Sequence, residues 1–314
     1  MRVGQNPAKS TKEVPQPRTV TVALVTYIPF LSGFYAQSLD ILKACLDSLW
    51  QKTQIDYDLL VFDNASCAEV RAYLSSAHQQ GKIQYLVFSE QNIGKGGAWN
   101  FIFQAAPGEI IAYADSDISF SPGWLAVSLK ILDSFPNVGM VTARPMRSPE
   151  EFYTNSLEWA RQAKDISLEN GVFIDWEDYR QHVFSLGTNE TEAREWYESR
   201  TDWRVTRDNI SALISAAHFQ FSAKKAVLQQ FVPFNMDRPM GQVRMLDERL
   251  NDAGYLRLCT TTTYVQHMGN RITEDGQLAQ KSRRTGSQKK LSNIPVVRRT
   301  LLWIYDRIFE LYNQ

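Results

Sequence analysis

The fold is decided by one stretch, Ile110-Ile111-Ala112-Tyr113-Ala114-Asp115-Ser116-Asp117, which joins an apolar run to two carboxylates two positions apart. Pro107 and Gly108 precede the run and polar residues follow it, a pattern typical of a central strand covered on both faces. Such strands present ligand-binding groups at their carboxyl ends. We therefore predict that Asp115 and Asp117 lie at the mouth of a cleft.

Two carboxylates crowded at a strand end repel each other unless a cation neutralises them. Hard oxygen ligands suit Mg²⁺ or Mn²⁺, which can bridge to the phosphates of a substrate. The competing interpretation is that Asp115-Ser116-Asp117 only caps a turn, because Asp and Ser side chains readily bind their own backbone. Both interpretations remain open for a motif this short.

The composition is that of a globular protein: 314 residues, 44% hydrophobic and 22% charged, with 34 basic and 34 acidic residues. With no net charge, a general attraction to nucleic acid or membrane is not expected. Cys45, Cys67 and Cys259 lie far apart in the sequence, without metal-ligand spacing, which favours a reducing, cytoplasmic location. Neither a secretory signal nor an apolar run long enough to span a bilayer is present.

Hydrophobic periodicity alternates between strand and helix through the first half of the chain. β-Branched runs indicate strands at 19–27, 57–62, 83–88, 110–115 and 138–143. Apolar residues at three- and four-residue steps indicate helices at 39–49, 69–79, 95–105 and 125–135. This alternation predicts a doubly wound α/β domain with parallel strands and right-handed crossovers.

The periodicity is less even from 147 to 210, which we interpret as an insertion. It contains four of the eight tryptophans, whose indoles either form platforms for sugar faces or simply pack in a core. Beyond it, the pattern predicts a helix at 223–230, a helix at 243–253 and one strand at 256–265 that ends at Gln266-His267-Met268-Gly269-Asn270.

A glycine-rich turn, Asn92-Ile93-Gly94-Lys95-Gly96-Gly97, opens the helix before the central strand. Glycines there let backbone amides approach a phosphate near a helix N-terminus. The turn matches neither the dinucleotide-binding fingerprint nor the phosphate-loop motif, and tight packing alone can explain it.

Taken together and in order, these features resemble a family-2 glycosyltransferase of the GT-A fold, over roughly 19–270. The order is more specific than any single motif. The residues that carry the resemblance are Thr26-Tyr27, Asp63-Asn64-Ala65-Ser66, Asn92-x-Gly94 with Asn100, Asp115-Ser116-Asp117, Asp247, Gly254-Tyr255 and His267.

The resemblance implies a mostly parallel GT-A sheet with helices on both faces, and a role for each motif. Nucleotide-sugar binding is implied for Thr26, Tyr27, Asp63, Asn92, Gly94, Lys95, Asp115 and Ser116. Asp117 would bind a divalent cation, Mn²⁺ or Mg²⁺, with Asp115 and His267 as further ligands. His267 is otherwise an ordinary strand-end histidine, and Lys95 an ordinary surface lysine.

An inverting transfer needs a general base for the acceptor hydroxyl, and Asp247 is the candidate. The family carries its acidic pair about one helical turn farther from the helix-ending glycine, here Gly254, so Glu248 and Asp237 remain alternatives. Asp247 and Glu248 would otherwise pair with neighbouring arginines on a solvated face.

The expected function is inverting, metal-dependent transfer of a sugar from a nucleoside diphosphate sugar to a hydroxyl acceptor, in surface-glycan or glycolipid assembly. One alternative is a catalytically silent scaffold that binds nucleotide sugar or membrane. A nucleotidyltransferase is disfavoured because Thr26-Tyr27-Ile28-Pro29 is not a glycine-rich basic loop. The expected partners are the nucleoside diphosphate sugar and a hydroxyl acceptor, for which a lipid-linked molecule is one candidate. Nucleic acid is not an expected partner.

The C-terminal part is basic and then amphipathic. Between 281 and 299 lie seven basic residues and no acidic one, and apolar residues then recur at helical spacing. We expect 281–312 to contact the inner face of the cell membrane peripherally, although the helix could instead pack on the catalytic domain or a second subunit. The expected divisions are a disordered tail (1–17), a nucleotide-sugar half (18–146), an insertion (147–210), an acceptor half (211–270), a basic linker (271–294) and an amphipathic helix (295–314).

Overall fold

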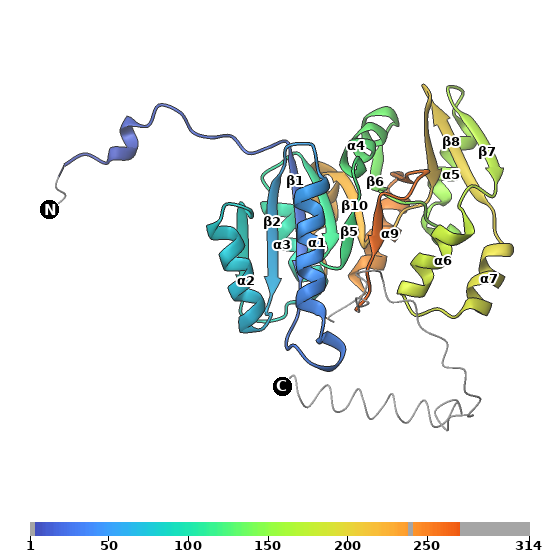
Figure 1. Ribbon diagram of the computed structural model, residues 1–314. Helices are drawn as coiled ribbons and strands as arrows, with labels where there is room; N and C mark the ends of the chain where they lie inside the picture. Colours follow the sequence, from blue (N-terminus) through green and yellow to red (C-terminus); the bar gives the residue numbers. More distant parts are fainter. Residues whose placement is uncertain (1–3, 238–240, 271–314) are drawn as a thin grey trace, which may run out of the picture. The chain divides into compact units, whose positions relative to one another are not determined.

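The computed structural model describes residues 4–237 and 241–270. The described residues form a large mixed sheet with helices on both faces (Figure 1). Its strands are β1 (Val20–Thr26), β2 (Asp58–Asn64), β3 (Tyr85–Ser89), β4 (Ile110–Asp115), β6 (Val138–Thr142), β7 (Ser167–Gly171), β8 (Asp202–Arg207), β9 (Ile210–Ile214), β10 (Gln220–Lys224) and β11 (Leu256–Cys259). A second, two-stranded sheet contains β5 (Ile118–Phe120) and β12 (Val265–His267).

The α-helices are α1 (Ser38–Lys52), α2 (Ala68–Gln79), α3 (Gly94–Ala105), α4 (Trp124–Ser134), α5 (Thr154–Gln162), α6 (Trp176–Ser185), α7 (Glu190–Glu198), α8 (Lys225–Leu228) and α9 (Gln242–Asp252). Short 3₁₀ turns occur at η1 (Pro7–Ser10), η2 (Gly33–Tyr35), η3 (Glu150–Phe152) and η4 (Gln229–Phe231). In the described part of the chain, none of the helices has the length and apolar character needed to cross a membrane.

The order of strands in the large sheet is β3-β2-β1-β4-β10-β6-β11-β9-β8-β7. The first four strands are parallel, as the alternation of strand and helix predicts. β10 then runs antiparallel to both β4 and β6, while β11 is parallel to β6. The doubly wound α/β half is therefore confirmed, and the sheet continues beyond it as a mixed sheet.

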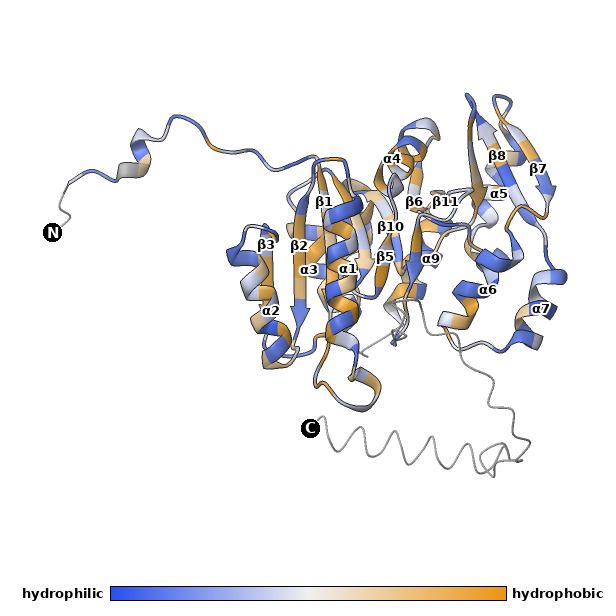
Figure 2. Cartoon of the chain, viewed as in Figure 1, coloured by the Kyte–Doolittle hydropathy of each residue, from blue (hydrophilic) through white to orange (hydrophobic). Residues whose placement is uncertain are grey.

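Alternate residues of the central strands pack on opposite faces of the sheet, because successive strand side chains point in opposite directions. Val22 and Leu24 join the apolar cluster that contains the buried side chains of α1 and α2. Ala23 joins the cluster that contains those of α3 and α9. Figure 2 shows apolar residues gathered on these strands, whereas most of α7 is hydrophilic.

Two of the expected elements are wrong in their bounds. The strand expected at 256–265 is two strands, because β11 pairs with β6 and β9 whereas β12 leaves that sheet and pairs with β5. The helix expected at 223–230 begins only at Lys225, because Ala223 and Lys224 pair with β4 in the sheet.

The segment interpreted as an insertion contributes to the main sheet. β7 and β8 pair with each other, and β8 pairs with β9 through a tight turn at Asp208 and Asn209. Both turn residues have positive φ (48° and 63°), as a two-residue hairpin turn with a right-handed twist requires. The basic linker and the amphipathic helix expected after 270 lie outside the described residues.

Candidate active site

The carboxyl end of β4 carries Asp115, and the backbone turns there into β5. The Asp115 amide donates to the carbonyl of Phe219 (2.8 Å), which fixes this end of β4 against the approach to β10. Its carboxylate accepts a hydrogen bond from the Tyr113 hydroxyl (2.6 Å) and forms an ion pair with the Lys95 ammonium (2.6 Å to Oδ1). Asp115 is thus neutralised and held by two side chains.

Lys95 lies in the first turn of α3, and its ammonium is packed between aromatic rings. The ring centroids of Trp99 and Tyr113 are 5.5 and 5.4 Å from Nζ, so cation–π attraction adds to the ion pair. Burial raises the pKa of the Tyr113 hydroxyl well above its usual value, and the Asp115 charge raises it further. The hydroxyl therefore stays protonated as a donor to Asp115.

Asp117 lies beside His267 because β5 and β12 pair in antiparallel register, with His267 opposite Ile118. The Nε2 atom of His267 is 3.2 Å from one Asp117 oxygen, and its Nδ1 is 3.0 Å from the Ser185 hydroxyl at the end of α6. Burial lowers the pKa of His267, but the hydrogen bond and charge of Asp117 outweigh it, so the net shift is upward.

The donor set around Asp117 fits a divalent cation in part. The second Asp117 oxygen, Oδ1, is buried and has no hydrogen-bond partner, which is costly unless a cation or ligand satisfies it. Among the described residues, however, no three His, Cys, Asp or Glu side chains are grouped closely enough to form a complete metal cage. The protein thus supplies few ligands, which is the usual arrangement where substrate phosphates and water complete the coordination of Mg²⁺.

The glycine-rich turn is held by two asparagines from neighbouring strand ends. The Asn64 amide group donates to the Asn92 side chain (2.8 Å), and the Asn64 oxygen accepts from the Ile93 amide (2.9 Å). Asn92 in turn accepts from the Gly94 amide (2.9 Å). Gly94 has φ +71°, a conformation that favours glycine, so this turn sets where α3 and Lys95 begin.

The residues expected to bind the nucleoside meet at the ends of β1 and β2. Thr26 pairs with Asp63 in register, and its hydroxyl is buried without a partner. The Asp63 carboxylate is fully buried and accepts from Arg71 Nε (3.1 Å) and from the Ser66 amide (3.3 Å). Tyr27 follows, with its ring 6.3 Å from that of Tyr35. Their nucleoside-binding role stays a prediction.

The expected base, Asp247, comes from α9 and is only 3% exposed. One carboxylate oxygen accepts from the Arg257 guanidinium (2.6 Å), and the other is 2.9 Å from Nδ1 of His218. Arg257 is fully buried and also donates to the carbonyls of Phe152 (2.8 Å) and Ala216 (2.9 Å). Burial lowers the pKa of the Arg257 guanidinium, although the charge of Asp247 opposes that shift.

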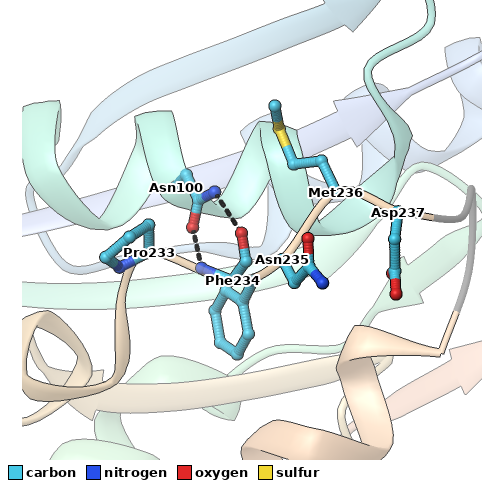
Figure 3. A pocket seen from close by; sticks show the side chains of 6 residues that line it. All are labelled: Asn100, Pro233, Phe234, Asn235, Met236 and Asp237. Atoms are coloured by element: carbon cyan, nitrogen blue, oxygen red, sulfur yellow. Dashed lines mark hydrogen bonds between the residues drawn. The ribbon is translucent and has the colours of Figure 1, made fainter.

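The two alternative bases lie elsewhere. Glu248 points to the surface and pairs with Arg244 (2.7 Å). Asp237 lines an open hollow of about 640 Å³ together with Asn100 and residues 233–236 (Figure 3). The Asn100 side chain forms two hydrogen bonds with the backbone of Phe234 (2.6 and 3.0 Å), and these bonds hold the segment at 233–236 against α3.

Five residues that contact the candidate site residues were not identified from the sequence. They are Arg71, Tyr113, Ser185, His218 and Arg257. Two of them carry a local signal: a lone arginine in the apolar strand Leu256-Arg257-Leu258-Cys259 needs a buried partner, and Tyr113 lies two residues before Asp115 on the same strand face. His218 and Ser185 have no such signal, because their partners lie 29 and 82 positions away, and Arg71 has none although Asp63 lies only 8 positions before it.

The fold is of the GT-A type. The chain superposes on a solved structure of GalNAc-T7 with UDP, GalNAc and Mn²⁺ with a TM-score of 0.51 at 14% identity, covering 90% of this chain and 48% of that one. It is also similar to the mannosyltransferase PcManGT from Pyrobaculum calidifontis, in complex with GDP-Man and Mn²⁺ (TM-score 0.47, 18% identity, 80% and 56% coverage).

The sequence is similar to one glycosyltransferase family over part of its length. Residues 34–189, just under half of the chain, match the model of glycosyl transferase family 2, the family that the motifs suggested. An uncharacterized glycosyltransferase of Nostoc sp. is 26% identical over 100 residues, which are 32% of this chain. The match spans about a third (31%) of that relative's own length.

Proposed function

We propose that this protein is an inverting, metal-dependent glycosyltransferase that moves a sugar from a nucleoside diphosphate sugar to a hydroxyl group. The observation that carries the proposal is the unpartnered, buried oxygen of Asp117 beside His267, at the carboxyl end of the central strand. A divalent cation held by Asp117, with Asp115 and His267 near it, would act as a Lewis acid on the departing diphosphate. The Mn²⁺ in the GalNAc-T7 structure supports this choice of cation.

The remaining residues divide the work of binding the donor. Thr26, Tyr27 and Asp63 would hold the nucleoside at the ends of β1 and β2. Lys95 would move from Asp115 to the diphosphate as that group arrives, because its ammonium already lies at the site and, among the described residues, pairs with the single carboxylate of Asp115. Asn92 and Gly94 would keep the start of α3 in place, and Ser116 would complete the turn between the two acids.

The acceptor side would lie around Asp247. An inverting displacement needs a proton acceptor on the face of the sugar opposite the diphosphate. Asp247 is connected to the donor side through β10, since His218 and Phe219 lie directly before that strand and Phe219 binds the Asp115 amide. We assign proton removal to Asp247 or a side chain in contact with it, and not to Glu248, which forms an ion pair with Arg244 at the surface.

The experiment is a thermal-shift screen of UDP, GDP and dTDP sugars with Mn²⁺ or with a chelator. A donor at about one hundred times its Kd should stabilise the protein by about 2.7 kcal/mol. Asp117→Ala should abolish the Mn²⁺-dependent part of the shift, whereas Asp133→Ala, an exposed acid on α4, should not. Equal shifts in Mn²⁺ and in chelator, for wild type and Asp117→Ala alike, would remove the metal from the proposal.

We further propose that residues 281–312 dock the protein peripherally on the inner face of a cell membrane and that the acceptor is lipid-linked. The support is the sequence alone, seven basic residues followed by an amphipathic pattern. The full chain should sediment with anionic but not neutral liposomes at low salt. A variant with Lys289, Lys290, Arg298 and Arg299 changed to Gln should stay in the supernatant. If the wild-type chain also stays there, the membrane proposal fails.

A further inference from the structure

His218 is the exposed member of a buried charge cluster that the sequence did not reveal. Its side chain is 38% exposed, whereas the Asp247 side chain that it contacts is 4% exposed. Asp247 is bonded on its other oxygen to Arg257, which is fully buried. The cluster therefore runs from the interior outward in the order Arg257, Asp247, His218, and only the histidine offers a large surface to a molecule in solution.

Asp247 is poorly placed to take a proton from an acceptor by direct contact. Both carboxylate oxygens already have partners within the protein, at 2.6 Å and 2.9 Å. Because its side chain is only 4% exposed, Asp247 could meet a sugar or lipid hydroxyl only if His218 moved aside or the ion pair with Arg257 broke. Breaking that ion pair is costly because it would leave a buried guanidinium uncompensated. The same contacts suit a different task, which is to hold the ring of His218 in one orientation.

His218 also lies just before β10, which pairs with the carboxyl-terminal part of β4 in the sheet that carries the proposed donor site. The next residue, Phe219, accepts a hydrogen bond from the Asp115 amide (2.8 Å) through its carbonyl. The Phe219 ring is 6.3 Å from that of His267. Phe219 therefore contacts Asp115 through its backbone and lies near His267 through its ring, so His218 is one residue away from contacts with two residues of the proposed metal and diphosphate site.

We propose that His218 is the catalytic base and that Asp247 and Arg257 are positioning residues; this inference rests on the proposed glycosyltransferase function. Nδ1–H donates to Asp247, which leaves the lone pair of Nε2 for the acceptor hydroxyl. The hydroxyl oxygen attacks the anomeric carbon as its proton passes to Nε2. The bond from that carbon to the diphosphate breaks, and its electron pair leaves with the nucleoside diphosphate. Asp247 stabilises the imidazolium, which then returns its proton to water.

The first test compares His218→Ala with His78→Ala in the full chain. His78 is a matched control, because its Nδ1 also bonds a single acceptor, the carbonyl of Ile83 (2.7 Å), but lies on α2. The readouts are calorimetric binding of the donor found in the screen, with Mn²⁺, and release of its nucleoside diphosphate with water as the acceptor. His218→Ala should bind the donor as wild type does and release nucleoside diphosphate about a hundred- to ten-thousand-fold more slowly.

Imidazole added to the buffer should restore part of the lost rate of His218→Ala, in proportion to its concentration, and should not change that of His78→Ala. Donor turnover by His218→Ala at the wild-type rate would overturn the assignment to His218 while leaving the glycosyltransferase function intact. If the wild-type chain binds none of the donors, the proposed function itself fails.

A second measurement needs no donor. Nitrogen-15 NMR of the histidine side chains should find neutral His218 protonated on Nδ1, and Asp247→Leu should remove that preference. A His218 protonated on Nε2 in the wild-type chain would overturn the inference, because the nitrogen that does not contact Asp247 would then be a donor and not a base.

Discussion

Replacing Arg257 by methionine should destabilise the protein strongly. Methionine has a similar reach but no charge, so the Asp247 carboxylate would keep only His218 as a partner, and two buried carbonyls would lose their donor. The exposed fractions of the Arg257 and Asp247 side chains are 0% and 4%, so water cannot replace the lost contacts. Removing one partner of a buried ion pair costs about 3–5 kcal/mol.

The assay is urea unfolding followed by tryptophan fluorescence. With a denaturant dependence of about 3 kcal/mol/M, that loss lowers the midpoint by roughly 1–2 M. Arg244→Met is the matched control, because Arg244 lies on α9, pairs with Glu248 and is 64% exposed, so its replacement should barely move the midpoint. The double variant Asp247→Leu, Arg257→Met should recover part of the loss, since it buries no unpaired charge. Equal midpoints for Arg257→Met and Arg244→Met would refute this account of the cluster.

Two further predictions concern the donor site and the thiols. Lys95→Met should weaken UDP binding roughly tenfold or more in a calorimetric titration, because the diphosphate would lose a charged hydrogen bond from Lys95 and would face the unpaired Asp115 carboxylate. An unchanged affinity would exclude Lys95 from the diphosphate site. Burial raises the pKa of the Cys259 thiol to about 12 and also raises that of Cys45, so both thiols should stay protonated near pH 8 and resist iodoacetamide. The less buried Cys67 should react first, and mass spectrometry that finds Cys259 labelled as fast as Cys67 would contradict this prediction.

The first half of the fold could be predicted because its signals are local. The strand at 19–27 and the helix at 39–49 each carry their own period in the sequence, and both are confirmed as β1 and α1. The split between β11 and β12 could not be predicted in this way. β12 leaves the large sheet because it pairs with β5. In that pairing Val265 lies opposite Phe120, which is 145 residues earlier in the chain, and no local pattern encodes such a partner.

The same limit applies to the site. Asp115 and Asp117 follow from the pattern of β4, which ends at Asp115 with Asp117 in the turn that follows, whereas their place at the mouth of a cleft stays a prediction. The histidine that contacts Asp247 comes from 29 positions earlier in the chain, and the arginine from 10 positions later. Sequence reasoning therefore selected Asp247 as an acid near the right helix but could not foresee that both of its oxygens would be bound. Such pairings arise only when β10, β11 and α9 pack together.

The most direct test of the central claim is the release of nucleoside diphosphate from a panel of UDP, GDP and dTDP sugars by the full chain. We expect at least one donor to be turned over in Mn²⁺ and the release to fall to background in a chelator. Asp117→Asn should show the same loss in Mn²⁺, while Asp133→Asn should behave as wild type. Release from none of the donors, or release that neither the chelator nor Asp117→Asn diminishes, would contradict a metal-dependent glycosyltransferase.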